Sequence, residues 1–446
     1  MIEISDPLIM SALKIIERSR PTSTIPHYPP FAAWQPLEDK KKIFAAWKET
    51  IKQRPSIGLN IHIPFCRSVC SFCNVEPRQA VKSGGKNILS DYLNALRKEI
   101  KMYGTVFGDF EFSSLYVGGG TPNILTPVQI RKLLAIVDEN FKFSVNCHRF
   151  FEVNPSFLNE NRLKALKAGK VTELGIGIQS LDDEVIRKSG RTQDNSSVRR
   201  CFKNARKYGI PRLLIDLIAG LPGQSEKSFL KDVKTVASWK PDDIYLGEFS
   251  PVNTAFERSG GKTSDDKAVL SLKKGLSLLK AMGYHHRGRE SYATLNPRSQ
   301  NWRGFHPFFG SDSILGLGAG AVSHAWGQLR YSNTPDWKEY AAKLRANVSP
   351  VLKGSKLDIG SEMINFMLSS FERGWASKKE FMVEFGESMD EHFKDELKYL
   401  LDGGIIEGKG SRYCVRNFDR ISYFSGKAFF EPKIIKKIFK TVLQGK

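Results

Sequence analysis

Three cysteines, Cys66, Cys70 and Cys73, follow one another with C-x₃-C-x₂-C spacing in the segment "NIHIPFCRSVCSFCNV". Thiols this close together in a chain without a secretion signal are typical of metal or redox chemistry. A zinc site would need a distant second pair of cysteines or histidine ligands, and His62 is equally consistent with a core position. Three thiolates would instead leave one iron of a [4Fe-4S] cube open, where a small molecule can bind.

The motif resembles the signature of the radical S-adenosylmethionine (SAM) enzymes. Five further segments, "IHIPFC", "YVGGGTPNIL", "FEVNP", "GIGIQSLDDEVIRKSGR" and "IDLIAGLPGQ", resemble the oxygen-independent coproporphyrinogen III oxidase group. That group has methyltransferase, cyclopropane-forming and haem-chaperone relatives. The resemblance implies that Cys66, Cys70 and Cys73 hold a [4Fe-4S] cluster whose open iron is chelated by SAM. It also implies that reductive cleavage of SAM releases methionine and a 5′-deoxyadenosyl radical.

The resemblance assigns further residues to SAM. Gly118, Gly119 and Gly120 would meet its methionyl end, where glycines allow close approach and their N–H groups suit a carboxylate. Glu152 and Asp216 are acidic residues at expected strand ends, where an unpaired buried charge is costly, and the resemblance implies that they contact the ribose and amine of SAM. The other implied contacts are Asn60, Phe72, Thr121, Gln179, Arg191 and Ser250.

The oxidase type holds two SAM molecules in one pocket. By resemblance, Phe72, Gly120, Thr121, Ser250 and the loop 315–322 would face the second molecule. These assignments make a second SAM an expected cofactor of this chain.

Two positions depart from the porphyrinogen oxidases. Those enzymes carry a fourth cysteine where this chain has Val75, and a tyrosine in the first strand where it has Asn60. Three functions therefore stay open, ranked in this order. The first is transfer of a methyl or methylene group from a second SAM to an sp² carbon of an unsaturated or heteroaromatic substrate. The second is oxidase-like or haem-degrading chemistry on an anionic tetrapyrrole. The third is a non-catalytic haem chaperone, which an N-terminal arm of about 55 residues disfavours.

The elements that must position these residues alternate along the chain. Apolar strand candidates lie at 57–63, 113–119, 149–154, 172–178, 212–218 and 243–249, with helical patterns between them, one of which starts at Thr126. This alternation predicts a parallel α/β sheet. Two further units before residue 290 are missing, so we expect an incomplete (β/α)6 radical SAM barrel. Its site would lie at the C-terminal ends of the strands.

Three domains are predicted: an N-terminal substrate-capping arm (1–55), the partial barrel (56–290) and a C-terminal oxidase-like domain (291–446). The last is expected to be mostly helical and winged-helix-like. It begins with a Gly-rich turn-and-strand region, "SDSILGLGAGAVSHAWG", which would form a loop covering the site.

Composition narrows the range of partners. The net charge of +21 favours an anionic small-molecule substrate over nucleic acid, because the lysines are scattered and no nucleic-acid motif accompanies them. An aromatic substrate fits the resemblance equally. The sequence has no apolar run of about 18 residues, so a membrane span is not expected. With no secretion signal, a cytoplasmic location is expected, and the resemblance implies a reducing partner such as flavodoxin or ferredoxin.

Overall fold

The structure is a computed structural model. It describes residues 28–416 and 429, except 38, 75–78, 82–85, 252–253, 262–264, 287–291, 296–312 and 373. Val75, one of the two departures from the oxidases, lies outside the described residues, as do the first 27 residues of the predicted arm.

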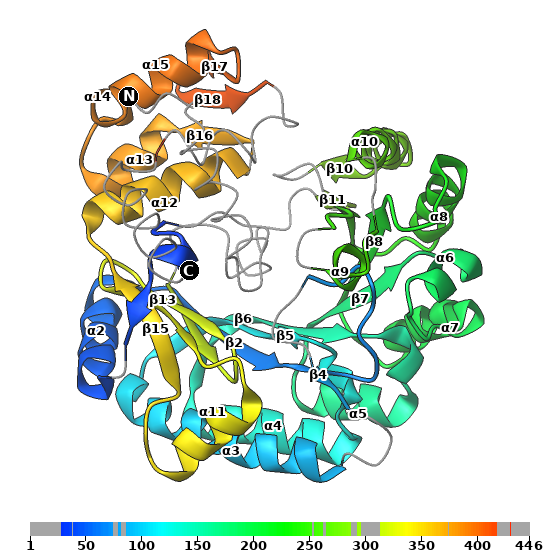
Figure 1. Cartoon of the computed structure of the whole chain (residues 1–446), viewed down its shortest axis with the longest axis horizontal. Coiled ribbons are helices and arrows are strands. Elements are labelled where there is room, and N and C mark those ends of the chain that lie inside the picture. The colour runs from blue at the N-terminus through cyan, green and yellow to red at the C-terminus, as the bar shows by residue number, and fades with distance from the viewer. Residues whose placement is uncertain are drawn as a thin grey trace.

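Six parallel strands form the barrel. In spatial order they are β2 (Ile57–Ile63), β5 (Glu111–Gly119), β6 (Lys142–Val153), β7 (Glu173–Gln179), β8 (Arg212–Ala219) and β9 (Asp243–Glu248). They coincide with the six predicted strands, so the incomplete (β/α)6 barrel is confirmed. Figure 1 shows the strands curving along the inner side of the molecule, with helices outside them.

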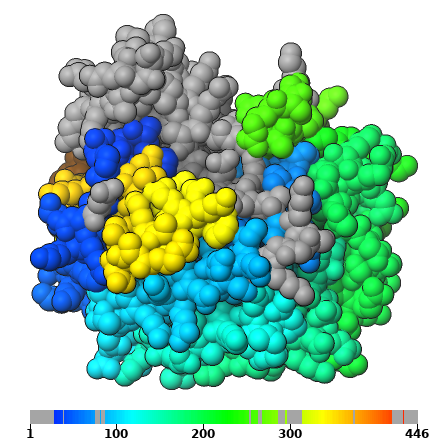
Figure 2. All heavy atoms as spheres, turned by 60° about the horizontal axis from the view of Figure 1, so that its bottom comes forward, coloured from blue at the N-terminus to red at the C-terminus, as the bar shows by residue number. Residues whose placement is uncertain are grey.

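Helices cover the outer face of these strands: α3 (Lys86–Phe107), α4 (Pro127–Asn140), α5 (Glu160–Ala168), α6 (Asp183–Lys188), α7 (Asn195–Lys207), α8 (Glu226–Ser238) and α10 (Asp265–Ala281). The helix predicted at Thr126 is α4, which begins with a capping box between Thr126 and Gln129. Figure 2 shows the cyan-to-green part of this layer from below as a continuous surface.

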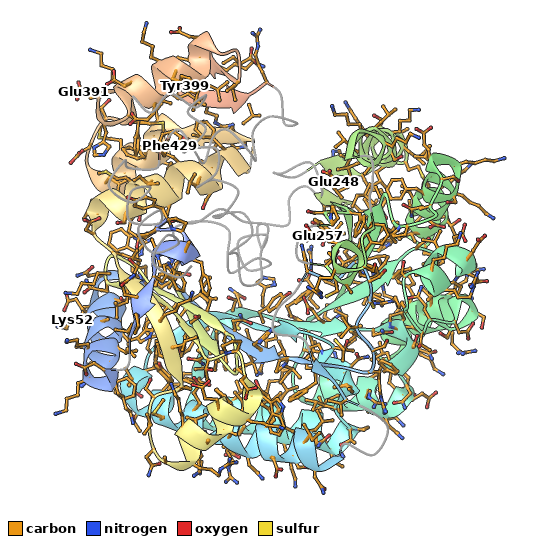
Figure 3. The ribbon with its side chains drawn as sticks, viewed as in Figure 1. Lys52, Glu248, Glu257, Glu391, Tyr399 and Phe429 are labelled. Atoms are coloured by element: carbon orange, nitrogen blue, oxygen red, sulfur yellow. The ribbon has the colours of Figure 1, made fainter. Side chains whose placement is uncertain are left out.

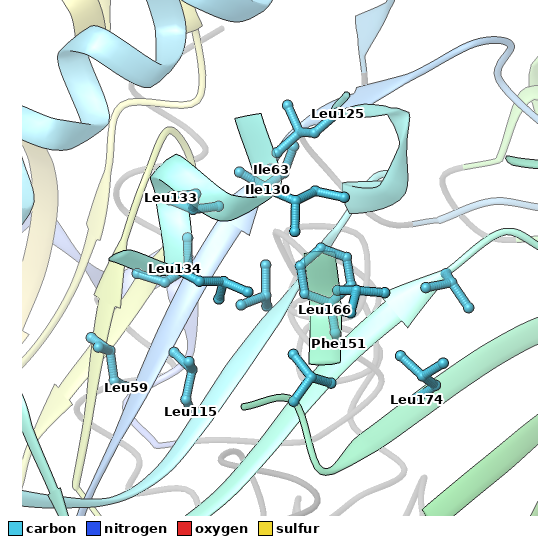
Figure 4. Close-up of a cluster of buried hydrophobic side chains, with 14 of the residues drawn as sticks. Leu59, Ile63, Leu115, Leu125, Ile130, Leu133, Leu134, Phe151, Leu166 and Leu174 are labelled. Atoms are coloured by element: carbon cyan, nitrogen blue, oxygen red, sulfur yellow. The ribbon is translucent and has the colours of Figure 1, made fainter. Parts of the chain in front are cut away.

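The core lies between the strands and this helical layer. Leu59 of β2, Leu115 of β5 and Phe151 of β6 are fully or almost fully buried there. They meet Leu133 and Leu134 of α4, as Figure 4 shows. Because side chains alternate along a strand, the intervening residues of β2, β5 and β6 face the interior of the barrel.

Short elements complete the barrel region: η1 (Phe31–Ala33), β1 (Gln35–Pro36), α2 (Lys40–Gln53), β3 (Phe65–Cys66), β4 (Gln79–Ala80), η2 (Pro122–Ile124), η3 (Pro155–Phe157), α9 (Ala255–Arg258), β10 (His285–His286) and β11 (Tyr292–Thr294). The last two pair antiparallel beyond β9.

The sheet also extends past β2. Strand β12 (Ser313–Leu317) pairs parallel with β2, and β13 (Val322–Ala325), β14 (Leu329–Asn333) and β15 (Val351–Lys356) follow antiparallel. Helix α11 (Trp337–Arg345) connects β14 to β15. The Gly-rich segment expected to form a covering loop therefore contributes two strands, β12 and β13, to the sheet. The domain boundary at residue 290 stays a prediction, since the sheet crosses it.

A second hydrophobic core begins at α12 (Ile359–Glu372). With β16 (Trp375–Ser377), α13 (Lys378–Phe385), α14 (Met389–His392), α15 (Lys394–Asp402), β17 (Ile406–Lys409) and β18 (Arg412–Val415), it forms the predicted helical, winged-helix-like region. The exposed side of α15 carries Lys394 and Lys398 beside Asp395 and Asp402. This balanced charge gives no electrostatic support to nucleic-acid binding.

Within the described part of the chain, every helix is too short or too polar to span a lipid bilayer.

Candidate active site

A pocket of about 300 Å³ lies at the C-terminal ends of the barrel strands, the place where barrels of this kind carry their sites. It is lined by every residue that the resemblance assigned to the cluster or to SAM except Asn60, Gly118 and the segment 315–322, which lies in and after β12 and contributes no lining residue. These lining residues are Cys66, Cys70, Phe72, Cys73, Gly119, Gly120, Thr121, Glu152, Gln179, Arg191, Asp216 and Ser250. Segments far apart in the chain thus meet in one pocket.

The cysteine loop is fixed on both sides by backbone hydrogen bonds. Ser71 N–H donates to the carbonyl of Ser189 (2.9 Å), and Phe256 N–H donates to the carbonyl of Ser71 (3.0 Å). Cys73 N–H donates to the carbonyl of Cys70 (3.2 Å), which closes the turn between these two cysteines. The loop therefore holds its thiols in place through contacts with α6 and α9.

The three thiols interact electrostatically. Burial, with a smaller contribution from the charges of Cys73 and Cys70, raises the pKa of the Cys66 thiol to about 11. The hydroxyl of Thr121, 3.3 Å from Cys66 Sγ, acts in the opposite direction by donating a hydrogen bond. A bound metal centre would supply the positive charge that these thiolates need.

A zinc site and a [4Fe-4S] cluster would place the three sulfurs differently. Among the described residues, no three His, Cys, Asp or Glu side chains are close enough to hold a single metal ion. Zinc would draw its sulfur ligands to within about 4 Å of one another, because each Zn–S bond is about 2.3 Å. A [4Fe-4S] cube binds each thiolate at a different iron and so keeps the sulfurs farther apart.

The glycine segment packs tightly against the cysteine loop. A Cβ on Gly120 would lie 2.7 Å from the Phe65 carbonyl oxygen and 2.9 Å from Cys66 Sγ. Gly119 adopts φ +115°, and a Cβ there would lie 2.4 Å from the His62 ring. Only glycine fits at these positions, because a side chain would collide with His62, Phe65 or Cys66; the predicted approach of this segment to SAM stays a prediction.

The glycine amides have partners within the protein, and their role toward SAM stays a prediction. Gly119 N–H donates to Glu152 Oε2 (3.0 Å), and Gly120 N–H donates to the Ile63 carbonyl (2.8 Å). Thr121 N–H likewise donates to the Phe65 carbonyl (2.8 Å). These N–H donors are used within the protein, because the chain directly after β5 hydrogen-bonds to the end of β2 and to β3.

Two half-buried carboxyl groups, Glu152 and Asp216, face the pocket from β6 and β8. Glu152 accepts hydrogen bonds from Tyr116 OH and Gly119 N–H, and burial raises its pKa to about 6. Burial raises the pKa of Asp216 to about 8; the charge of Glu152 adds to this rise and that of Arg191 opposes it. Within the described part of the chain, Asp216 has no hydrogen bond or ion pair. A ligand with ammonium and sulfonium charges, such as SAM, would compensate both carboxylates.

Gln179 and Arg191 lie beside these acids. Gln179 ends β7 with φ +71°, next to an irregularity in the β7–β8 pairing. Arg191 donates to the Gly177 carbonyl and, at 3.0 Å, to Gln193 Oε1, so its guanidinium is anchored near Asp216. Strained backbone of this kind in a non-glycine residue is found most often at functional sites.

The remaining predicted residues flank the pocket. Asn60 is buried on the inner face of β2, and Gly118 lies where a Cβ would meet the Tyr116 ring at 2.3 Å. Phe72 packs against an apolar cluster that includes Phe249. Ser250 follows β9 next to Glu248, which Figure 3 labels on the edge facing the C-terminal domain.

Sequence reasoning missed two inward-facing aromatic residues and underused His62. Tyr116 stacks on Phe150 with ring centroids 4.9 Å apart, and Tyr245 lines the pocket. His62 Nδ1 lies 2.7 Å from the Ala319 carbonyl, which only accepts, so Nδ1 carries the proton. The buried Nε2, beside Gly119, is an acceptor with no hydrogen-bond partner among the described residues. Period-two alternation from Gly118 and Asn60 is the signal that identifies Tyr116 and His62.

Comparison with known proteins gives the class of the molecule. Residues 60–236 match the family model described as the Radical SAM superfamily. The chain therefore contains a radical SAM domain, and this domain implies a [4Fe-4S] cluster and SAM as cofactors.

Full-length relatives refine this assignment. The chain is 28% identical over 371 residues to the oxygen-independent coproporphyrinogen III oxidase of Escherichia coli, and the alignment covers 78% of each of the two chains. It is 27% identical over 360 residues to the heme chaperone HemW of Bacillus subtilis, covering 79% of this chain and 93% of the relative. The solved structure of coproporphyrinogen III oxidase (HemN) from Escherichia coli superposes with a TM-score of 0.79 at 23% identity, covering 94% and 98%. The resemblance to this group, and the fold it implies, are confirmed.

Proposed function

We propose that this chain is a radical SAM enzyme whose pocket binds a [4Fe-4S] cluster through Cys66, Cys70 and Cys73 and binds SAM beside it. When bound, the cluster supplies the electron that cleaves SAM to methionine and a 5′-deoxyadenosyl radical. The observation that carries the proposal is that three thiols, the two acids Glu152 and Asp216, and Gly119 with Gly120 line one pocket of about 300 Å³.

The residues of this chain bind and orient the cationic ligand. Glu152 and Asp216 offer negative charge where no described lysine or arginine pairs with it directly, so the SAM ammonium and sulfonium groups gain a favourable field. Gln179 and Arg191, which line the same pocket, would hydrogen-bond to SAM and pair with its carboxylate. Gly119 and Gly120 keep side chains out of the space between β2 and β5, so that a ligand can approach the cysteine loop.

For the step that follows radical formation, we propose transfer of a methyl or methylene group from a second SAM to an sp² carbon of an unsaturated or heteroaromatic substrate. The supporting observation is Asn60, a buried amide on the inner face of β2 where the oxidases carry a tyrosine. Phe72, Gly120, Thr121 and Ser250 line the side of the pocket where the second SAM would bind.

Oxidase-like or haem-degrading chemistry on an anionic tetrapyrrole is the second candidate. It is favoured by the similarity to coproporphyrinogen III oxidases, which extends over 78% of the chain. A haem chaperone is the third, favoured by the similarity to HemW. A flavodoxin- or ferredoxin-type reductant and a cytoplasmic location remain predictions for each of the three.

The test uses anaerobically reconstituted protein with reductant, SAM and cell extract, followed by mass spectrometry of the nucleoside products. One-carbon transfer predicts 5′-deoxyadenosine together with S-adenosylhomocysteine, both dependent on extract. 5′-Deoxyadenosine alone would favour the oxidase-like candidate. Neither product, together with tight haem binding, would refute the enzyme proposal and favour the chaperone.

A further inference from the structure

Tyr116 lies on the inner face of β5, before this strand reaches the pocket. It pairs in register with Asn60 of β2 on one side and with Phe150 of β6 on the other. Its ring stacks on that of Phe150, with ring centroids 4.9 Å apart and ring planes at 16°. Phe150 packs with Leu214 and Tyr245 in a small apolar cluster separate from the main core. The barrel interior therefore has an aromatic floor, to which Tyr116 adds a hydroxyl group.

Two glycines make room for this stack. A Cβ on Gly118, two residues after Tyr116 on the same face, would lie 2.3 Å from Cε1 of the tyrosine ring and 2.9 Å from Glu152 Oε2. A Cβ on Gly175 of β7 would lie 2.3 Å from Cζ of Phe150. A side chain at either position would displace the stack. Gly118, which does not line the pocket, thus leaves the space in which the tyrosine reaches Glu152.

The hydroxyl of Tyr116 is one of two donors that hold Glu152. It donates a hydrogen bond to Oε1, and Gly119 N–H donates to Oε2 at 3.0 Å. Each carboxylate oxygen has two lone pairs, so each keeps one accepting position for a ligand in the pocket that Glu152 lines. The two donors therefore fix the orientation of this carboxylate from the protein side.

The same two hydrogen bonds favour the negatively charged form of Glu152. Burial raises the pKa of this acid to about 6, and the bonds from Tyr116 and Gly119 act in the opposite direction. A hydrogen bond to a charged acceptor is stronger than one to a neutral acceptor, which is why these donors oppose protonation.

Other ionisable groups surround this acid on neighbouring elements. Asp216 of β8 is close enough for the charge of Glu152 to raise its pKa, and Arg191, after α6, acts on Asp216 in the opposite direction. His62 of β2 lies against the glycine segment, and burial lowers its pKa, so it is neutral at pH 7. Among the described residues, Tyr116 is the only side chain that donates a hydrogen bond to Glu152.

We propose that Tyr116 is a positioning residue for SAM, whose hydroxyl keeps Glu152 ionised and orients its remaining lone pairs toward the ligand. This inference rests on the proposed function, because the ligand is the SAM that the pocket is proposed to bind. An ionised carboxylate accepts hydrogen bonds from the amine or ribose of SAM more strongly than a protonated one does. Tyr116 thus acts on SAM through Glu152, although it is not one of the residues that line the pocket.

The test is the affinity of the reconstituted, unreduced protein for SAM, measured by calorimetry at pH 6 and pH 9. Tyr116→Phe keeps the stacked ring and removes only the hydroxyl. Losing this hydrogen bond should raise the pKa of Glu152 by about one unit or more, so SAM binding should weaken about fivefold or more at pH 6. At pH 9 the loss should be less than about threefold, because Glu152 is then ionised in both proteins. Titration of Asp216 and of the SAM amine occurs in both proteins, so comparison with the wild type at one pH largely cancels it.

Two further variants distinguish positioning from a folding defect. In a Glu152→Gln background, Tyr116→Phe should change SAM affinity by less than about twofold, because the hydroxyl acts through the acid. Tyr340→Phe is the matched control, since Tyr340 OH also donates to a buried glutamate, Glu99, but outside the pocket (2.5 Å). It should leave SAM affinity unchanged at both pH values.

A second measurement, chemical denaturation at several pH values, needs no SAM. The pKa of Glu152 in the folded protein is above its usual value of 4.5. Its contribution to stability is therefore complete below that pH and is lost as the pH rises to about 6. In Tyr116→Phe this loss should continue to higher pH, and in Glu152→Gln it should disappear.

Three binding results would overturn the inference: wild-type SAM affinity in Tyr116→Phe at pH 6, an equal loss at both pH values, or an equal loss in the Glu152→Gln background. An unchanged pH dependence of stability in Tyr116→Phe would also overturn it. No SAM binding by the wild-type protein at either pH would instead contradict the proposed function, and denaturation would still show whether Tyr116 holds Glu152.

Discussion

The two halves of the inner sheet face differ in charge. At the ends of β6 and β8, two half-buried carboxyl groups face the pocket, and Asp216 has no partner among the described residues. On β14 and β15 the charged groups are cations with partners in the protein: Arg330 donates a hydrogen bond to Asn365, and the Lys353 ammonium lies 3.5 Å from the centroid of the Phe31 ring. A ligand with a positive charge is expected at the first half.

The contrast separates a cofactor site from a packing surface. The acidic half lies beside the cysteine loop and is marked by sequence motifs, because SAM and the cluster impose the same requirements on every protein that binds them. The basic half has no motif, since its cations contact residues of α12 and of the arm in the same protein. Unpaired charge in a partly buried position is costly, and in the acidic half this cost is what indicates a missing ligand.

The largest effect is expected from the cysteines. Cys66→Ala, Cys70→Ala or Cys73→Ala should abolish both the broad visible absorbance of the reconstituted protein and SAM cleavage, because each thiolate would bind a separate iron. Cys414→Ala, in β18 of the C-terminal region, is the control and should retain both. If any of these three cysteine variants kept its visible absorbance and its SAM cleavage, the assignment of the cluster and SAM to the acidic half would be wrong.

Gly120→Ala tests the close approach behind the cysteine loop. The added Cβ would lie 2.7 Å from the Phe65 carbonyl oxygen, so the loop must shift. We expect SAM cleavage to fall by at least about 100-fold, as displacements of about 1 Å do in other enzymes. Gly360→Ala, where the nearest atom is 3.7 Å away, should be near neutral. Unchanged SAM cleavage in Gly120→Ala would show that the glycine has no role in positioning.

Asp216→Asn should act on binding and stability in opposite directions. Losing the negative charge should weaken SAM binding by about 10- to 100-fold, measured by calorimetry, and leave iron content intact. The same change should raise the free energy of unfolding at pH 8 by about 1–3 kcal/mol, because an unpartnered buried charge disappears. Asp395→Asn, exposed on α15, is the control for both measurements. A variant with wild-type affinity would remove Asp216 from the cofactor half.

Glu99 provides a buried acid of the opposite kind. It accepts hydrogen bonds from Gly318 N–H (2.8 Å), Asn333 Nδ2 (2.7 Å) and Tyr340 OH (2.5 Å), and burial raises its pKa to about 7. The folded protein therefore holds this proton more tightly than the unfolded chain. Stability should fall as pH rises from about 4.5 to 7, by about 1–3 kcal/mol.

Glu99→Gln should remove this pH dependence, as measured by chemical denaturation at several pH values. It should affect SAM affinity far less than Asp216→Asn does, because the donors around Glu99 belong to the protein. A large loss of SAM binding in Glu99→Gln would mean that a missing hydrogen-bond partner does not identify the acid that binds SAM.

Much of the cofactor half was predictable from the sequence. Alternating apolar segments located the six barrel strands, and Thr126 with Pro127 located the start of α4. The acceptors of the Gly119 and Gly120 amides, Glu152 and the Ile63 carbonyl, could not be predicted, because they depend on how strand ends meet in space. The role of "SDSILGLGAGAVSHAWG" was missed because its glycines resemble those of a loop.

The basic half was not predictable. Arg330 and Lys353 are far apart in sequence from Asn60, and only the register of four neighbouring strand pairs places them on its face. Tyr116 was accessible in principle, since strand alternation relates it to Gly118. Charge compensation, by contrast, depends on which partners surround a group, and a sequence contains that information only through the fold.

The measurement that tests the central claim most directly is electron paramagnetic resonance of the anaerobically reconstituted, reduced protein with and without SAM. We predict the signal of a reduced [4Fe-4S] cluster in the wild-type protein, a changed signal when SAM is added, and no signal in Cys66→Ala. A cluster signal that does not respond to saturating SAM, or no cluster signal in the wild-type protein, would contradict the account.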